Sequence, residues 1–340
     1  MNNLIERERR PIKGLMAAEW VVAAYLVGTT ALMLLTFTSL HEPGQMFALR
    51  LKVVGITALL YLIYRLWPCR LTRMLRIGAQ LAMLSWWYPD TYEFNRMFPN
   101  LDHVFAQWEQ DLFGCQPALL FSQAIDSHVF SEMMDLGYAS YFPLIALVAA
   151  YYFFCRYEAF GRVSFILLTS FFVYYIIFIA LPVAGPQYYY AAVGTDDIAR
   201  GVFPNIGDWF ADHQDVLESP GYKDGIFYQL VAQAHAAGER PTAAFPSSHV
   251  GVSTILVIMA WTAGGGRVRR RSYNGRQSRK AGAPKRMLFL VLLPFYVLLC
   301  LSTVYIQAHY AIDVLAGWAS GGMFYFVLYY TYEYMIGKRR

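Results

Sequence analysis

The stretch WVVAAYLVGTTALMLLTFTSL, from Trp20 to Leu40, contains no charged side chain. A helix that crosses the hydrocarbon core of a bilayer needs ~20 consecutive apolar residues, and this run has that length. It is too long for the core of a cleaved signal peptide, so it is interpreted as a retained span. Across the chain, 57% of the residues are hydrophobic, 17% are aromatic and only 15% are charged. This composition predicts a membrane protein rather than a soluble one.

Further apolar runs predict an all-α, polytopic membrane helical bundle. Residues 1–340 are predicted to form a single membrane domain, because no internal repeat or low-complexity linker divides them. The third predicted span contains Arg76, and the sixth is short. The eight spans that fit best are Trp20–Leu40, Val53–Trp67, Met74–Tyr88, Leu136–Cys155, Val163–Val183, Val250–Ala263, Met287–Tyr305 and Val314–Ile336.

The placement of basic residues predicts the orientation of these spans. Lys and Arg in short loops favour the cytoplasmic side, and with a cytoplasmic N-terminus most of the 28 Lys and Arg residues lie inside. Both termini are then cytoplasmic. The run Arg267–Arg286 is interpreted as a cytoplasmic anchor near anionic headgroups, and no nucleic-acid partner is expected. The predicted parts are N-terminal spans 18–88, an outer amphipathic segment 89–135 and core spans 136–336, with an outer loop 184–248 and a cytoplasmic basic loop 264–286.

The segment Phe245–His249 (FPSSH) directly precedes the sixth span. Pro followed by Ser is typical of a helix start, where a Ser hydroxyl caps free backbone N–H groups. The N-terminus of a helix binds anions, and phosphate in particular. Ser247 and Ser248 are therefore candidate substrate-binding residues, and His249 lies within reach of a bound phosphate.

His309 and Asp313 occur four residues apart, in the segment YIQAHYAIDVLAG. In a helix they share one face, where the carboxylate can hold one imidazole nitrogen and leave the other free to react. An Asp at the edge of an apolar span also needs a partner or a function. Taken alone, the pair is equally compatible with a helix-capping Asp beside an interfacial His.

Two spans separate His249 from His309, so both histidines are expected at the same membrane face. Two histidines, a carboxylate and a helix N-terminus suit a two-step phosphoryl transfer. His309 would attack phosphorus, and His249 would protonate the departing alcohol and then activate the acceptor. This scheme requires no cofactor and no metal. A metal site built from His249, His309 and Asp313 is the alternative, but it lacks a nearby fourth ligand.

These segments resemble the phosphatidic acid phosphatase type 2 superfamily. Phe245–His249 resembles its Pro-Ser-x-His motif, and Ser302–Gly317 resembles its Ser-Arg-x₆-His-x₃-Asp motif. The resemblance implies a six-helix phosphatase-type core, a phosphohistidine at His309 and an acid–base role for His249. It also implies independence of metals.

Two positions depart from the phosphatase pattern: Thr303 replaces the arginine of the second motif, and Gln233 replaces the lysine of an upstream Lys-x₆-Arg-Pro motif. Both departures are similar to the inositolphosphotransferase branch, which contains inositol phosphorylceramide synthases. The segment Leu181–Tyr190 agrees with that branch and contributes the candidate substrate-binding residues Gln187 and Tyr188. Without the usual cations, the candidate phosphate ligands of the outer loop are Arg240 and Arg200.

Three functions follow from these observations. The first is transfer of a phospho-headgroup, plausibly inositol phosphate, from a donor phospholipid to a lipid alcohol such as ceramide or diacylglycerol. The second is a lipid phosphate or prenyl diphosphate phosphatase, with water as the acceptor. The third is a transporter or an inactive scaffold, which predicts more polar spans than the sequence contains. In the first two, the active site is expected on the non-cytoplasmic face.

Overall fold

The computed structural model describes residues 4–265 and 286–337, and within these ranges the chain forms helices and no β-strand. The all-α prediction is confirmed. Most of the predicted cytoplasmic basic loop lies outside the described residues. The helices are α1 (Ala17–Leu35), α2 (Pro43–Leu66), α3 (Arg70–Ala82), α4 (Leu84–Asn95), α5 (Asp102–Phe113), α6 (Pro117–Ala124), α7 (His128–Ala139), α8 (Tyr141–Cys155), α9 (Tyr157–Ala180), α10 (Pro186–Val193), α11 (Thr195–Ala199), α12 (Ile226–Gly238), α13 (Ser248–Gly265), α14 (Met287–Tyr305) and α15 (Ala311–Gly337), with short 3₁₀ turns η1 (Phe37–Ser39) and η2 (Trp209–Ala211).

Several helices of the described chain are long and apolar enough to cross a membrane. Five pass by length and composition, namely α1, α2, α9, α14 and α15, and the bent pair α7–α8 raises the number to six. Helix α13 is apolar but shorter. The chain is therefore an integral membrane protein with five or six candidate spans by this measure, where the sequence predicted eight.

Two predicted spans are interrupted in the structure. The third falls across α3 and α4, which are separated at Met83, so neither helix is long enough on its own. The fourth is the pair α7–α8, which bends by 48°. Pro143 lies in the first turn of α8 and has no backbone N–H to donate. The Ser140 hydroxyl donates a 2.6 Å hydrogen bond to the Gly137 carbonyl. Both features favour a bend at this point.

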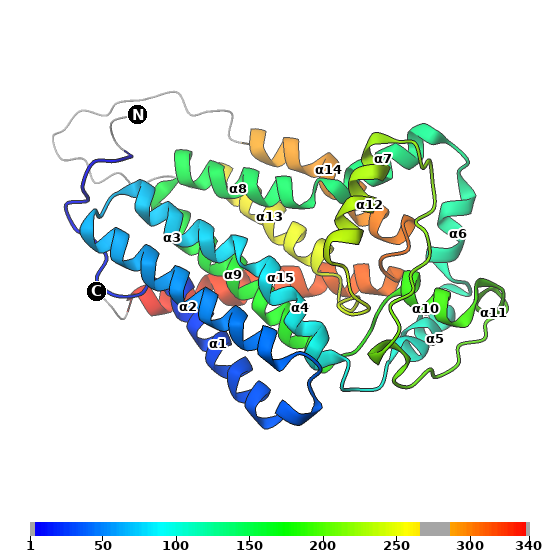
Figure 1. Cartoon of the computed structure of the whole chain (residues 1–340). Coiled ribbons are helices and arrows are strands. Elements are labelled where there is room, and N and C mark those ends of the chain that lie inside the picture. The colour runs from blue at the N-terminus through cyan, green and yellow to red at the C-terminus, as the bar shows by residue number, and fades with distance from the viewer. Residues whose placement is uncertain (1–3, 266–285, 338–340) are drawn as a thin grey trace.

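Basic residues from distant segments meet at one end of the bundle. Arg73 pairs with Glu8, Arg162 pairs with Glu333, and Arg156 donates to the Ala263 carbonyl at the end of α13. Figure 1 shows the beginning of α3 and the end of α15 at this end, while α5, α6, α10 and α11 gather at the other end. The long helices thus separate a basic end from an end built of short helices and loops.

Helices α13 and α15 cross at glycines, which lets the two backbones approach closely. A Cβ atom at Gly321 would lie 2.3 Å from the Gly251 carbonyl oxygen, and one at Gly317 would lie 2.8 Å from the Ser247 carbonyl oxygen. Small residues at such spacing are typical of tightly packed membrane helices. The crossing fixes the start of α13 against the start of α15, where the two candidate catalytic segments lie.

Replacing Gly321 with Ala is expected to destabilise the protein by about 1–3 kcal/mol, because the added methyl group overpacks the crossing. Gly322→Ala is the matched control, since a Cβ atom there meets nothing within 4 Å and Ala favours a helix more than Gly does. Thermal unfolding in detergent would compare the two variants. Equal melting temperatures would contradict the close crossing.

Candidate active site

His309 lies in the short connection between α14 and α15, and its ring is oriented by a backbone carbonyl. The His309 Nδ1 atom is 2.8 Å from the Ala244 carbonyl oxygen. A carbonyl oxygen only accepts hydrogen bonds, so Nδ1 carries the proton and Nε2 carries the free lone pair. The side chain is almost fully buried, with 3% exposure. His309 is thus held in the tautomer that leaves Nε2 available as a nucleophile.

Asp313 lies in the first turn of α15, beside the same ring but not as its nearest partner. Its Oδ2 atom is 3.5 Å from His309 Nδ1 and accepts a 2.9 Å hydrogen bond from the Tyr310 N–H. The prediction that Asp313 holds the imidazole is therefore refined: the Ala244 carbonyl makes the shorter contact, and the carboxylate organises the loop that carries His309.

His249 lies in the first turn of α13 and faces His309. Its Nδ1 atom is 3.4 Å from His309 Nε2. Its ring lies against Tyr138 and Tyr141, with ring centroids 4.8 and 4.4 Å apart. Stacking on Tyr138 and contact with the tilted Tyr141 ring restrict the imidazole, and the ring atom directed at His309 is the one placed for proton transfer.

The start of α13 provides hydrogen-bond donors beside the two histidines. The Ser247 hydroxyl accepts from the Val250 N–H at 3.3 Å and caps the helix, and the Ser247 N–H donates to the Asp313 carbonyl at 3.1 Å. The N–H groups of Ser248 and His249 belong to the first turn, where a helix offers no internal acceptor. An anion next to His309 can therefore bind to this helix terminus.

A carboxylate that the sequence reasoning missed lies close to the histidines. Glu239 accepts from the Tyr138 hydroxyl at 3.1 Å and from the Gln187 side-chain amide at 3.0 Å. Gln187 also donates its backbone N–H to the Gln307 carbonyl, two residues before His309. Glu239 directly precedes the Arg-Pro pair that the sequence singled out, and this position was the only signal for it. Tyr188 is placed differently, because its ring packs against Phe210.

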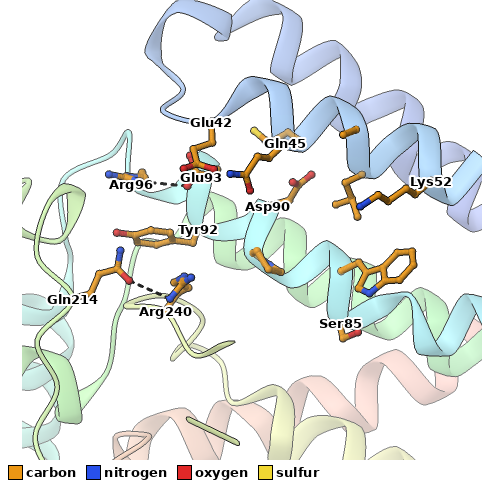
Figure 2. Close-up of a pocket in the computed structure, with 15 residues that line it drawn as sticks. Glu42, Gln45, Lys52, Ser85, Asp90, Tyr92, Glu93, Arg96, Gln214 and Arg240 are labelled. Carbon is orange, nitrogen blue, oxygen red and sulfur yellow. Dashed lines mark hydrogen bonds and ion pairs between the residues drawn. The ribbon is translucent and has the colours of Figure 1, made fainter. Parts of the chain in front are cut away.

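The two candidate phosphate arginines do not join the histidine pair. Arg200 is exposed and pairs with Asp197, three residues earlier. Arg240 hydrogen-bonds the Gln214 side chain at 3.3 Å and lines a separate cavity between α2 and α4. Figure 2 shows Arg240 and Gln214 at one edge of that cavity. Neither guanidinium contacts His249 or His309 in this structure.

Helix α5 supports the catalytic loop with two buried carboxylates. Asp102 accepts from the Tyr310 hydroxyl at 3.0 Å and from the Gly185 N–H at 2.8 Å. Glu109 accepts from the Ile312 N–H at 3.2 Å, and burial raises the pKa of Glu109 to about 8. These contacts fix Tyr310 and Ile312, which follow His309 at the start of α15. The sequence showed α5 as an amphipathic outer segment and gave no sign of this role.

Burial lowers the pKa of His309 to about 4, although the Ala244 hydrogen bond and the charge of Glu239 act in the opposite direction. The neutral, nucleophilic ring therefore persists at neutral pH and is lost as pH falls through about 4. With an activated donor that needs no proton, the rate of phosphoenzyme formation is expected to stay constant down to about pH 5 and to decline below it. A decline centred near the ordinary histidine pKa would contradict this assignment, and rapid-quench measurements would locate it.

Comparison with known proteins finds a match to the segment that contains the two histidines. Among the described residues, no three His, Cys, Asp or Glu side chains converge as metal ligands. No curated protein and no solved structure matches the chain. The model of the PAP2 superfamily matches residues 208–336, which include both histidines and Asp313. This integral membrane protein is thus similar, over residues 208–336, to the PAP2 superfamily, whose members are phosphatases and phosphotransferases.

Proposed function

We propose that the protein transfers a phospho-headgroup from a donor phospholipid to a lipid alcohol through a covalent intermediate on His309. The observation that carries the proposal is the opposition of two imidazoles in a buried site. His309 Nε2 has a free lone pair because Nδ1 donates to the Ala244 carbonyl, and His249 Nδ1 lies 3.4 Å away. One ring is thus prepared for attack and the other for proton transfer.

In the first step, His309 Nε2 attacks phosphorus, and the bond between phosphorus and the diacylglycerol oxygen breaks. His249 gives its proton to that oxygen, which leaves as the diacylglycerol hydroxyl. The start of α13 and the Ser248 hydroxyl stabilise the negative charge that spreads over the phosphoryl oxygens. The phosphoryl group enters between the two rings, so their contact opens when substrate binds.

In the second step, His249 accepts the proton of the acceptor hydroxyl. The acceptor oxygen attacks phosphorus, the bond between phosphorus and Nε2 breaks, and His309 is restored. The products are diacylglycerol and the lipid alcohol carrying the transferred headgroup. With water as acceptor, the same steps give a phosphatase.

Burial of the reaction centre favours transfer over hydrolysis. His309 is 3% exposed, and the rings of Tyr138 and Tyr141 cover His249. A site enclosed by aromatic side chains limits the entry of water and suits an acceptor that arrives from the bilayer. Ceramide and diacylglycerol are the acceptors that we propose, and inositol phosphate is the headgroup that we propose.

The proposal is tested with purified protein in nanodiscs and donor phospholipids labelled in the headgroup. Inositol, choline and simple phosphate lipids would be compared, each with and without ceramide or diacylglycerol. Transfer predicts a labelled lipid product that depends on the acceptor. Release of only water-soluble label, with no dependence on the acceptor, would assign the protein as a phosphatase.

We also propose that the active site faces away from the cytoplasm and that both termini are cytoplasmic. The basic contacts around Arg73 and Arg162 lie at the opposite end of the bundle from His309, as the bias of basic residues toward the cytoplasm requires. The exposed thiol of Cys155 ends α8 at the basic end. In intact cells, an impermeant maleimide should label a Thr195→Cys variant but should not label Cys155. Labelling of both before permeabilisation would contradict this orientation.

A further inference from the structure

A large cavity lies outside the histidine pair, between α2 and α4 (Figure 2). Its volume is about 670 Å³, within the range of about 300–1,000 Å³ that is usual for small-molecule sites. Residues of α2 lie on one side, residues of α4 lie on the other, and Gln214 and Arg240 close one edge. A buried ion pair between Arg50 and Asp90, 2.7 Å apart, joins the two helices.

The lining of this cavity combines apolar side chains with polar groups whose charges balance. Three carboxylates and three cations line it, together with the side-chain amides of two glutamines; these residues are Glu42, Asp90, Glu93, Lys52, Arg96, Arg240, Gln45 and Gln214. Equal numbers of the two charges give a multiply charged anion or a metal cation no net attraction. Adjacent donors and acceptors instead suit a ligand that does both, which is the property of hydroxyl groups.

Several polar atoms of the lining lack a partner among the described residues. The Glu93 Oε2 and Arg96 Nε atoms are buried and make no hydrogen bond. Leaving such groups unpaired costs free energy, and a bound ligand can relieve that cost. At this edge Arg240 reaches Gln214 at 3.3 Å, and Arg96 donates to the Ala211 carbonyl and to Glu93. Glu93 and Arg96 pair with each other through other side-chain atoms, at 3.3 Å, so a ligand must reorient both side chains to reach these buried atoms.

The cavity is connected to the reaction centre through two consecutive residues. Glu239 binds the Tyr138 hydroxyl, and the Tyr138 ring lies on His249. The next residue, Arg240, lines the cavity. Consecutive residues of one loop thus contact the histidine side and the cavity side.

We propose that the cavity between α2 and α4 binds the hydroxyl-rich headgroup of the donor phospholipid. Carboxylates of α4 accept hydrogen bonds from the headgroup hydroxyls, and Arg96, Arg240 and Gln45 donate to their oxygens. This inference rests on the proposed function, since it assigns the cavity to the donor of that reaction. It gives the N-terminal helices a part in substrate selection.

The test uses full-length protein in nanodiscs and the soluble headgroup glycerophosphoinositol as the probe, with glycerophosphocholine and free inositol for comparison. Gln45→Ala and Glu93→Gln each remove one hydrogen-bonding group, which corresponds to about a tenfold loss of affinity. Glycerophosphoinositol binding should weaken by that factor, and KM for the inositol lipid should rise similarly with little change in kcat. Glu218→Gln is the control, because Glu218 pairs with Lys223 on the exposed surface.

Gln45 is exposed, so its variant is expected to fold even if Glu93→Gln does not. Equal binding of glycerophosphocholine would overturn the assignment to a hydroxyl-rich headgroup. Equal binding of free inositol would assign the cavity to a soluble polyol and also overturn it. A fall in kcat with unchanged KM in Gln45→Ala would do the same.

The outcomes separate this inference from the proposed function. If the wild-type protein forms a phosphoenzyme and both variants bind the headgroup normally, the headgroup site is refuted and the proposed reaction stands. If headgroup binding weakens in Gln45→Ala but the wild-type protein forms no phosphoenzyme, the headgroup site stands and the proposed reaction is refuted.

Discussion

Replacing His309 with Ala is expected to abolish turnover and to abolish the acid-labile phosphoenzyme. The substitution removes the only ring whose free Nε2 atom faces His249 in the described structure. No neighbouring group can replace a covalent nucleophile that is oriented by a backbone carbonyl. Rapid-quench labelling with a headgroup-labelled donor would measure the intermediate, and product formation would measure turnover.

A matched histidine variant controls for this loss. His213 is exposed and stacks on Trp209, at 3.8 Å between ring centroids, without contacting the reaction centre. His213→Ala should therefore keep wild-type labelling and turnover. Thermal unfolding should show both variants folded. Normal turnover in folded His309→Ala would end the assignment of the nucleophile.

Replacing His249 with Ala is expected to lower turnover of ordinary phospholipids by about 10²–10⁴-fold, the usual contribution of general acid–base catalysis. Diacylglycerol leaves as an alkoxide unless it is protonated, so its departure depends on His249. A p-nitrophenyl ester leaves without a proton and should still label His309. If His249→Ala forms the phosphoenzyme with the p-nitrophenyl ester but not with the phospholipid, His249 is the general acid.

Tyr138 provides a check on the same assignment. Its ring packs on His249 and its hydroxyl binds Glu239, so Tyr138→Phe should keep the stacking and most of the activity. Equal loss of labelling with both donors in His249→Ala would show that His249 does more than protonate the leaving group.

Much of the fold follows from apolar run length, but the positions of the breaks do not. Helix α14 begins and ends at the predicted residues, because an apolar run bounded by polar segments has little freedom. The α3–α4 break at Met83 could not be predicted, since no Gly or Pro stands at this point to mark it. Arg76, which made the third span doubtful, is buried against Glu19. A charge that appeared to face lipid is thus neutralised inside the protein.

The two candidate catalytic histidines were accessible to sequence reasoning, whereas the groups that support them were not. His249 and His309 stand at helix ends in short local patterns, which a single sequence displays. The Ala244 carbonyl contacts His309 through backbone atoms, and such a contact leaves no residue signature. Asp102 and Glu109 act over long sequence distances, so no spacing rule connects them with the catalytic loop. The short sequence separation between Arg240 and His249 suggested that Arg240 lies near the site, but its side chain lines the neighbouring cavity.

The bond between Asp102 and Tyr310 also determines when activity can appear during synthesis. Its two residues are 208 positions apart in the chain, so α5 leaves the ribosome long before its partner exists. The loop that holds the nucleophile can close only after α14 and α15 have both been inserted and α15 has docked on α5. Closing such a long loop is entropically costly and slow. A nascent chain that lacks its last helix is therefore expected to be inert, which protects membrane lipids from a half-assembled enzyme.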